Sequence, residues 1–115
     1  MNGKYEKLVL ACLLMAPATA LAYPVQGPGA MSCAQFAKMY QADPSSETIF
    51  YTWAQGFWSS MNLTRQAAQG QMRDLGGDDN RRALRAFCAN NPLKDYMDGI
   101  LETYGKLPLI PKISN

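Results

Sequence analysis

The sequence predicts an all-α protein, a small irregular bundle of four to five helices stapled by one disulfide. Three observations predict this class. Apolar residues recur at spacings of three and four along most of the chain, which is the helical period. No segment alternates apolar and polar residues in the way that is typical of a strand, and there is no internal repeat or heptad pattern. Two cysteines remain outside a predicted N-terminal signal.

Residues 1–22 have the three-part layout of a cleavable secretory signal. Lys4 and Lys7 precede an apolar run at residues 8–16, and a small-residue pattern ends at Ala22, after which signal peptidase would cut. The run is shorter than the roughly 18 to 20 residues of a membrane-spanning helix. We therefore expect a protein in the periplasm or secreted, with no transmembrane segment after signal removal.

The three cysteines have two different predicted fates. Cys12 leaves with the signal, although residues 9–12 also match a lipobox, which would instead make Cys12 the acylated residue of a lipoprotein. In an oxidising compartment paired thiols are the default state, so we expect a disulfide between Cys33 and Cys88. Two buried free thiols are the alternative. Closing a loop of this length stabilises the fold by roughly 4 kcal/mol in the chain-entropy model.

Removal of the signal leaves 93 of the 115 residues, enough for one compact domain and too few for two. We place a flexible lead-in at residues 23–31, the helical domain at 32–107 and an extended tail at 108–115. Because the signal contains two Lys and one Glu, the mature part has nine basic and eight acidic residues, a net charge of +1. Phosphate binding needs a concentrated excess of Lys and Arg, so we do not expect a nucleic-acid partner.

The first two helices of the domain have clear start signals. Ser32 can cap a helix that ends before Asp43, and Asp43 followed by Pro44 is a second start. The second, central helix carries a continuous apolar stripe. Its Gly56 would let another helix approach closely, and Asn62 is a plausible left-handed end. The stripe consists of Ile49, Phe50, Trp53, Phe57 and Met61.

Three further segments follow the central helix. Residues 64–73 indicate a weaker Gln-rich helix or turn. Asp78 or Asp79 then caps a helix through Cys88, and Asn91 followed by Pro92 starts the last helix. The predicted core is Phe36, Ile49, Phe50, Trp53, Phe57, Leu84, Phe87, Tyr96, Met97, Ile100, Leu101 and Tyr104.

The residues offer little catalytic chemistry. The chain has no histidine, which removes the commonest general base and transition-metal ligand, so we expect no enzyme activity, no cofactor and no metal. Asp95 and Asp98 lie one helical turn apart and could share a proton, but their neighbours indicate a solvated face. Residues 74–80 cluster three carboxylates around two glycines. This segment lacks the ligand spacing of an EF-hand, so a glycine turn before a helix cap is the preferred interpretation.

Two groups are candidates for binding. Arg81, Arg82 and Arg85 form either a patch for an acidic partner or an ordinary solvated helix face, and Asp78 can pair with Arg82. Tyr51 and Trp58 share a face of the central helix that differs from the main stripe. They are either core residues or an exposed surface for a protein partner. In addition, residues 62–64 fit a glycosylation acceptor, which matters only in a eukaryotic host.

Several short motifs resemble a known family. The sequence resembles small periplasmic proteins of the acid-stress chaperone type, the HdeA/HdeB-like group. The motifs that carry this resemblance are SCAQF from Ser32, YTWAQGF from Tyr51, and Phe87-Cys88 together with Asn91-Pro92. The resemblance covers about residues 33–107. It implies an all-helical domain, a disulfide at the positions of Cys33 and Cys88, a homodimer at neutral pH, and acid-triggered exposure of apolar surface that captures unfolding clients.

The C-terminal segment departs from that group, because it has Lys106 and Lys112 in place of a lysine-rich end. A similar layout also occurs in small periplasmic immunity proteins that neutralise type VI secretion effectors, the Rap1a/Tai-like group. We therefore expect a non-enzymatic protein-binding domain, with acid-protective chaperoning as the leading function. The alternatives are effector neutralisation and a secreted helical protein with another role.

Overall fold

The protein is described here by a computed structural model, which covers residues 25–111. Within this range it is all-α, as predicted, and its only strand-like pairings are two isolated bridges. The predicted signal, its cleavage position and Cys12 lie outside the described residues. The helices are η1 (Gly27–Ala30) and η2 (Pro44–Ser46), both 3-10, and α2 (Cys33–Ala42), α3 (Glu47–Gln69), α4 (Asp78–Asn90) and α5 (Tyr96–Lys106).

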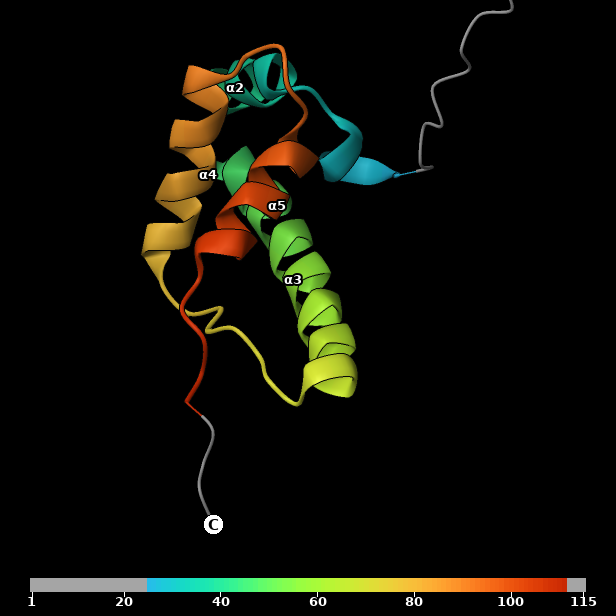
Figure 1. The fold of residues 1–115 in the computed structure, drawn as a ribbon. Coiled ribbons are helices and arrows are strands. Elements are labelled where there is room, and N and C mark those ends of the chain that lie inside the picture. Colours follow the sequence, from blue (N-terminus) through green and yellow to red (C-terminus); the bar gives the residue numbers. More distant parts are fainter. Residues whose placement is uncertain (1–24, 112–115) are drawn as a thin grey trace, which may run out of the picture.

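The longest helix, α3, forms one margin of the molecule (Figure 1). Figure 1 also shows α5 between α4 and α3, with α2 across one end of the bundle. Residues 70–77 cross from the end of α3 to the start of α4. The chain after α5 runs back beside this crossing, where the Asp74 N–H donates to the Pro108 carbonyl (2.8 Å) and the Ile110 N–H to the Met72 carbonyl (3.0 Å).

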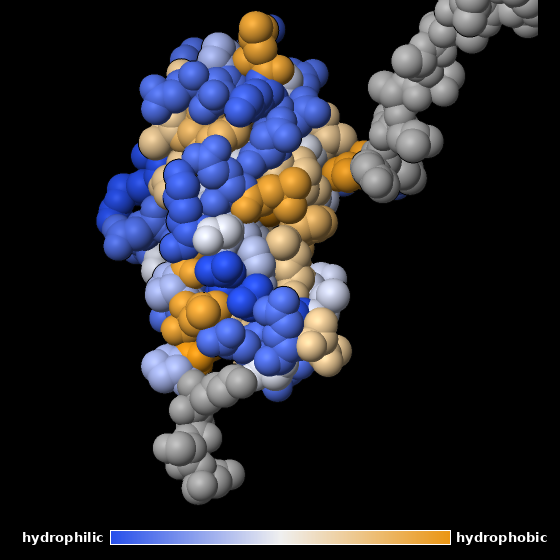
Figure 2. Space-filling view, viewed as in Figure 1, coloured by the Kyte–Doolittle hydropathy of each residue, from blue (hydrophilic) through white to orange (hydrophobic). Residues whose placement is uncertain are grey.

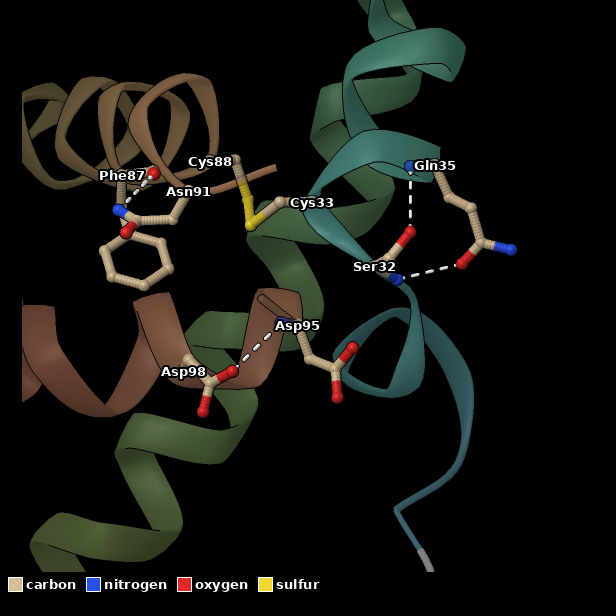
Figure 3. The surroundings of a disulfide bond; sticks show 8 residues. All are labelled: Ser32, Cys33, Gln35, Phe87, Cys88, Asn91, Asp95 and Asp98. Carbon is tan, nitrogen blue, oxygen red and sulfur yellow. Dashed lines mark hydrogen bonds between the residues drawn. A yellow bond between two sulfur atoms is a disulfide. The ribbon is translucent and has the colours of Figure 1, made fainter. Parts of the chain in front are cut away.

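The disulfide joins the start of α2 to the end of α4, as predicted (Figure 3). Ser32 caps α2: its hydroxyl oxygen accepts from the Gln35 N–H (3.1 Å), and its own N–H donates to the Gln35 side chain (2.8 Å). This reciprocal cap satisfies two backbone donors and sets where the helix begins. The cap therefore places Cys33 on the first turn, with its Cα 4.7 Å from that of Cys88.

The segment between α4 and α5 corrects a predicted helix start. Asn91 ends α4, and its side chain donates to the Phe87 carbonyl (2.9 Å). The next helix begins four residues later than the Asn-Pro signal predicts, after Asp95. The physical reason is a tertiary contact, because the Cys33 N–H at the start of α2 donates to the Lys94 carbonyl (2.8 Å). A helix that continued through this turn would use the Lys94 carbonyl for a hydrogen bond within the helix, and Cys33 would lose its acceptor.

The end of α3 also differs from the prediction. Residues 64–69 continue α3 instead of forming a separate weak helix, and Asn62 does not end it. The end is at Gly70, whose φ is 63° and whose N–H donates to the Gln66 carbonyl (2.9 Å). Glycine adopts this left-handed conformation without steric cost, which is why it stops the helix.

Two other starts shift by a few residues. Asp43 is a cap as predicted, but of η2: its carboxylate accepts from the Ser45 N–H (3.0 Å), and α3 follows η2. At the start of α4 the cap position is occupied by Gly77, with φ 106°, and neither aspartate caps the helix. Asp78 and Asp79 lie in the first turn, where their negative charges interact favourably with the positive end of the helix dipole.

The core corrects the predicted stripe of α3. The face of α3 that packs inward is centred on Ala54 and Trp58, so Trp53 and Phe57 are only half-buried and Ile49 is 63% exposed. On α5, Leu101 is 46% exposed and Met97 is half-buried. The buried members of the predicted core are Phe36, Phe50, Leu84, Phe87, Tyr96, Ile100 and Tyr104.

Close helix packing occurs at glycines other than Gly56. Nothing among the described residues lies within 4 Å of a Cβ built at Gly56. A Cβ at Gly99 would lie 2.7 Å from the Phe87 ring, so this glycine lets α5 approach α4. A Cβ at Gly29 of η1 would collide with the Trp53 indole, so only glycine fits at this position. Four residues of the expected lead-in therefore form a 3-10 helix that covers this indole.

Candidate functional site

The strongest candidate site is a buried carboxylate at the start of α3. Glu47 has a side chain that is only 5% exposed, and it is the one buried acidic residue among residues 25–111. Arg85 of α4 holds it with two hydrogen bonds, from Nε to Oε2 (2.6 Å) and from Nη2 to Oε1 (2.7 Å). Arg81, one turn earlier on α4, places its Nε 3.9 Å from Oε1. One carboxylate thus faces two guanidinium groups.

Two tyrosines complete what we call the Glu47 cluster, which comprises Tyr40, Glu47, Tyr51, Arg81 and Arg85. The Arg81 guanidinium lies 4.7 Å from the ring centroid of Tyr51, and that of Arg85 lies 4.7 Å from the ring of Tyr40. Such stacking is favourable because the ring face carries negative charge. The cluster therefore joins α2, α3 and α4 through side chains.

The electrostatics of the cluster favour the paired, charged form of the arginine. The hydrogen bonds that Arg85 donates to the Glu47 carboxylate raise the pKa of Arg85 above its ordinary value. Burial raises the pKa of the Tyr51 phenol, whose hydroxyl donates to the Gly77 carbonyl (3.1 Å) just before α4. Tyr51 is therefore a neutral donor at physiological pH, and it adds a second link between α3 and the start of α4.

No local sequence pattern signals this cluster, because Glu47 and Arg85 are 38 residues apart. The expectation that the three arginines lie outward holds for Arg82, which is exposed and pairs with Asp79 at i, i+3 in place of the predicted Asp78. It fails for the other two, which are half-buried. Their spacing of four residues on one helix face was the available clue to a shared partner.

Of the two interpretations of Tyr51 and Trp58, the exposed partner surface is contradicted by the structure. Both side chains are buried, and their rings pack edge to face with centroids 6.1 Å apart. The Trp58 Nε1–H donates to the Ile100 carbonyl on α5 (2.9 Å). The alternative interpretation, that this second aromatic face of α3 belongs to the core, is the correct one.

Asn62, the first residue of the glycosylation motif, has a structural role in the fold. Asn62 is buried, and its side-chain amide pairs with both backbone groups of Arg73: Nδ2 donates to the carbonyl (2.8 Å) and Oδ1 accepts from the N–H (3.0 Å). The Tyr104 hydroxyl also donates to Oδ1 (2.7 Å), and Arg73 Nη1 donates to the Leu107 carbonyl (2.6 Å). This network ties the crossing at residues 70–77 to α3 and to the end of α5.

The remaining acidic candidates are used as caps and turns. The Asp98 carboxylate accepts from the Asp95 N–H (2.9 Å) at the exposed start of α5 (Figure 3). In the segment of residues 74–80, Asp74 accepts from the Gly76 N–H (2.9 Å) and the Asn80 side chain donates to the Gly76 carbonyl (3.1 Å). No cluster of three or more potential metal ligands is found within residues 25–111.

A shallow groove of about 430 Å³ lies between α4 and α5. Small side chains, including Ala83 and Ala86, form part of its wall, with Asn90 and Thr103 as polar groups. The Glu102–Lys106 ion pair (2.7 Å) lies along it. Phe87, Leu107 and Pro108 also line the groove, so its wall combines apolar surface with amide, hydroxyl and paired charged groups.

Comparison with protein-family models, curated proteins and solved structures finds no match to this chain. Within residues 25–111, no helix combines the length and the apolar character needed to cross a membrane. The surface differs strongly from one side to the other (Figure 2). The side formed by α4 is mostly hydrophilic, whereas the margin formed by α3 shows mainly tan and pale residues in the hydropathy colouring.

Proposed function

We propose that this protein is a non-enzymatic, protein-binding domain of the bacterial periplasm that holds unfolding client proteins in acid. The observation that supports this function is the position of Glu47, a single buried carboxylate that balances Arg81 and Arg85 between α3 and α4. A carboxylate in this position makes the contact between two helices depend on its charge.

Acid removes that charge. Once Glu47 is protonated, two guanidinium groups face a neutral side chain, and the charge-assisted hydrogen bonds, typically about 1.5–3 kcal/mol each, are weakened. All other carboxylates are also neutral in strong acid, so the mature chain carries its nine basic charges without compensation. The self-repulsion of such a chain favours a more open state.

The disulfide limits how far this opening goes. It keeps α2 attached to α4 at any pH, while the Glu47 cluster that attaches α3 to α4 weakens. Movement of α3 would uncover apolar rings that are buried at neutral pH, among them Phe50, Trp58 and Tyr96. These rings form a surface suited to unfolding clients, which expose apolar segments of their own.

Effector neutralisation remains the second candidate function, and a specific observation favours it. Ile49 and Leu63 on α3 are 63% and 72% exposed without any acid-induced change. Apolar side chains that are exposed at neutral pH are groups that a single partner would contact there.

The deciding experiment measures the suppression of client aggregation by the oxidised protein at about pH 2–3, where carboxyl groups are protonated, and at about pH 7. Binding of an apolar dye is followed in parallel. We expect protection and dye binding only in acid. The Glu47→Gln variant should bind dye at a higher pH than wild type, whereas Glu102→Gln, which alters an exposed ion pair, should behave as wild type. Absence of protection at both pH values would refute the chaperone proposal.

A further inference from the structure

The segment of residues 25–30 lies against the indole of Trp53 on α3, and we call it the cover segment. Its helix η1 contacts both α3 and α5, and Figure 1 shows it beside the first turn of α5. Two of its glycines adjoin the two rings of the indole. A Cβ at Gly27 would lie 3.2 Å from Nε1 of Trp53, and a Cβ at Gly29 would collide with Cη2 and lie 2.6 Å from Cζ3.

The two glycines are needed for different reasons. Gly27 has a φ of 79°, a left-handed conformation that glycine adopts without steric cost. Gly29 has no positive φ, so its backbone conformation is open to other residues, and only its contact with the Trp53 ring excludes a side chain. Pro28 lies between them with a φ that its ring fixes. The surface of Trp53 is therefore complementary in shape to a Gly-Pro-Gly segment.

The cover segment is held on Trp53 by packing. Within residues 25–111, no backbone hydrogen bond joins residues 25–30 to α3 or α5, and Gly29 is the only buried residue of η1. The first such bond is at Met31, whose carbonyl accepts from the Tyr96 N–H (2.9 Å). The cover segment has no charged residue to form an ion pair. Segments with few buried contacts and few hydrogen bonds open at low free energy, so the cover segment can leave Trp53 while the disulfide and the cap of α2 stay intact.

We propose that Trp53 is a binding site for an uncharged Gly-Pro-Gly segment. The cover segment occupies this site, and a matching segment of another protein enters it when the cover segment leaves. Proline-containing segments commonly bind aromatic side chains, because proline orders the segment in advance. The Trp53 ring also stacks on Phe57, with centroids 5.7 Å apart and planes at 11°. Phe57 and Met61 are half-buried and continue the same face of α3, so a partner segment longer than the cover segment would contact them.

This site is independent of the proposed acid activity, which depends on Glu47. Residues 25–30 and Trp53 have no ionisable side chain, so no member of the contact changes its charge with pH. Because only Met31 and Ser32 join the cover segment to α2, its effective concentration at Trp53 is about millimolar. A free partner segment at lower concentration binds only when the cover segment is displaced. The cover segment is therefore an autoinhibitory contact.

The first test is a nitrogen–proton NMR correlation spectrum of the oxidised protein at neutral pH, in which each indole N–H gives one signal. The Trp58 N–H is buried and donates to the Ile100 carbonyl (2.9 Å), so its slow exchange with solvent distinguishes it from that of Trp53. In Gly29→Leu the Trp53 signal should move to the position of a solvent-exposed indole, and the Trp58 signal should stay. Ala30→Leu is the matched control, because Ala30 is the next residue of η1 and is exposed, and both signals should stay.

The second test supplies the segment in trans. A synthetic peptide with the sequence of residues 25–31, added to the Gly29→Leu protein at up to about 5 mM, should return the Trp53 signal toward its wild-type position. The same peptide carrying Gly29→Leu should not, and the wild-type protein should not respond to the native peptide below the millimolar range.

Three results would overturn the proposal. The first is a Trp53 signal in Gly29→Leu that equals that of wild type, and the second is the absence of any effect of the native peptide on this variant. The third is loss of the Trp58 signal in Gly29→Leu, because the cover segment would then be part of the core and would not be detachable.

Discussion

Replacement of Glu47 by Gln tests the energetic weight of the buried ion pair. Gln keeps the size of the side chain but presents one acceptor where Arg85 now finds two charged oxygens, at 2.6 and 2.7 Å. Removing one partner of a fully buried pair costs about 3–5 kcal/mol. The arginine side chains here are 34% and 38% exposed and can regain water, so we expect a smaller loss, about 2 kcal/mol. For a domain of this size that corresponds to roughly 8–16 °C in Tm.

The assay is urea denaturation of the oxidised protein, followed by circular dichroism at neutral pH and again in acid. In acid strong enough to protonate every carboxyl group, wild type and Glu47→Gln are both neutral at this position, so their stabilities should converge. Glu102→Gln is the control, because both members of the Glu102–Lys106 pair are exposed to solvent, which screens their attraction, so this variant should unfold at the same urea concentration as wild type. A Glu47→Gln variant as stable as wild type at neutral pH, or one with the same deficit in acid, would refute the reasoning.

Three further predictions concern packing, pH and the disulfide. Gly99→Ala should destabilise the fold by about 1–3 kcal/mol, because its Cβ would lie 2.7 Å from the Phe87 ring. Gly105→Ala should instead stabilise the fold by up to about 1 kcal/mol, because alanine has the higher helix propensity. Equal shifts in Tm for the two variants would contradict the close contact at Gly99. The hydrogen bond from Lys106 lowers the pKa of Glu102 in the folded state. The contribution of this ion pair to stability is therefore present above the ordinary carboxyl pKa, and it is lost as the pH falls through the lowered pKa of Glu102. Carboxyl NMR titration should show Lys106→Met returning that pKa toward its ordinary value, and an unchanged titration would argue against the pair. Reduction of the disulfide, which closes a 55-residue separation, should lower the urea midpoint by the equivalent of about 4 kcal/mol, and an unchanged midpoint would show that the cross-link is not needed.

The candidate site could be predicted only in part. The spacing of Arg81 and Arg85 on one face of a helix was visible, and it was interpreted as a solvated face or an acidic-partner patch. The partner, Glu47, lies on another helix, and no local pattern connects the two. The choice between core and exposed surface for Tyr51 and Trp58 could not be made from the sequence for a related reason, since periodicity reveals that a helix has two aromatic faces and does not reveal how many neighbours surround it.

The features that could be predicted from the sequence alone depend on local interactions. The helical period of the apolar residues predicted the all-α class, the reciprocal cap at Ser32 follows from residues three apart, and a count of two cysteines left one disulfide pairing. These features depend on short-range geometry or on simple counting, so they can be predicted without a fold.

Long-range contacts decided the rest. The rotation of α3 that buries Trp58 and exposes Ile49 is set by α2, α4 and α5 packing on one side of it. The last helix starts after Asp95, and not at Asn91, because the carbonyl at Lys94 accepts from the start of α2. In both cases the local pattern is compatible with two arrangements, and contacts between distant segments select one of them.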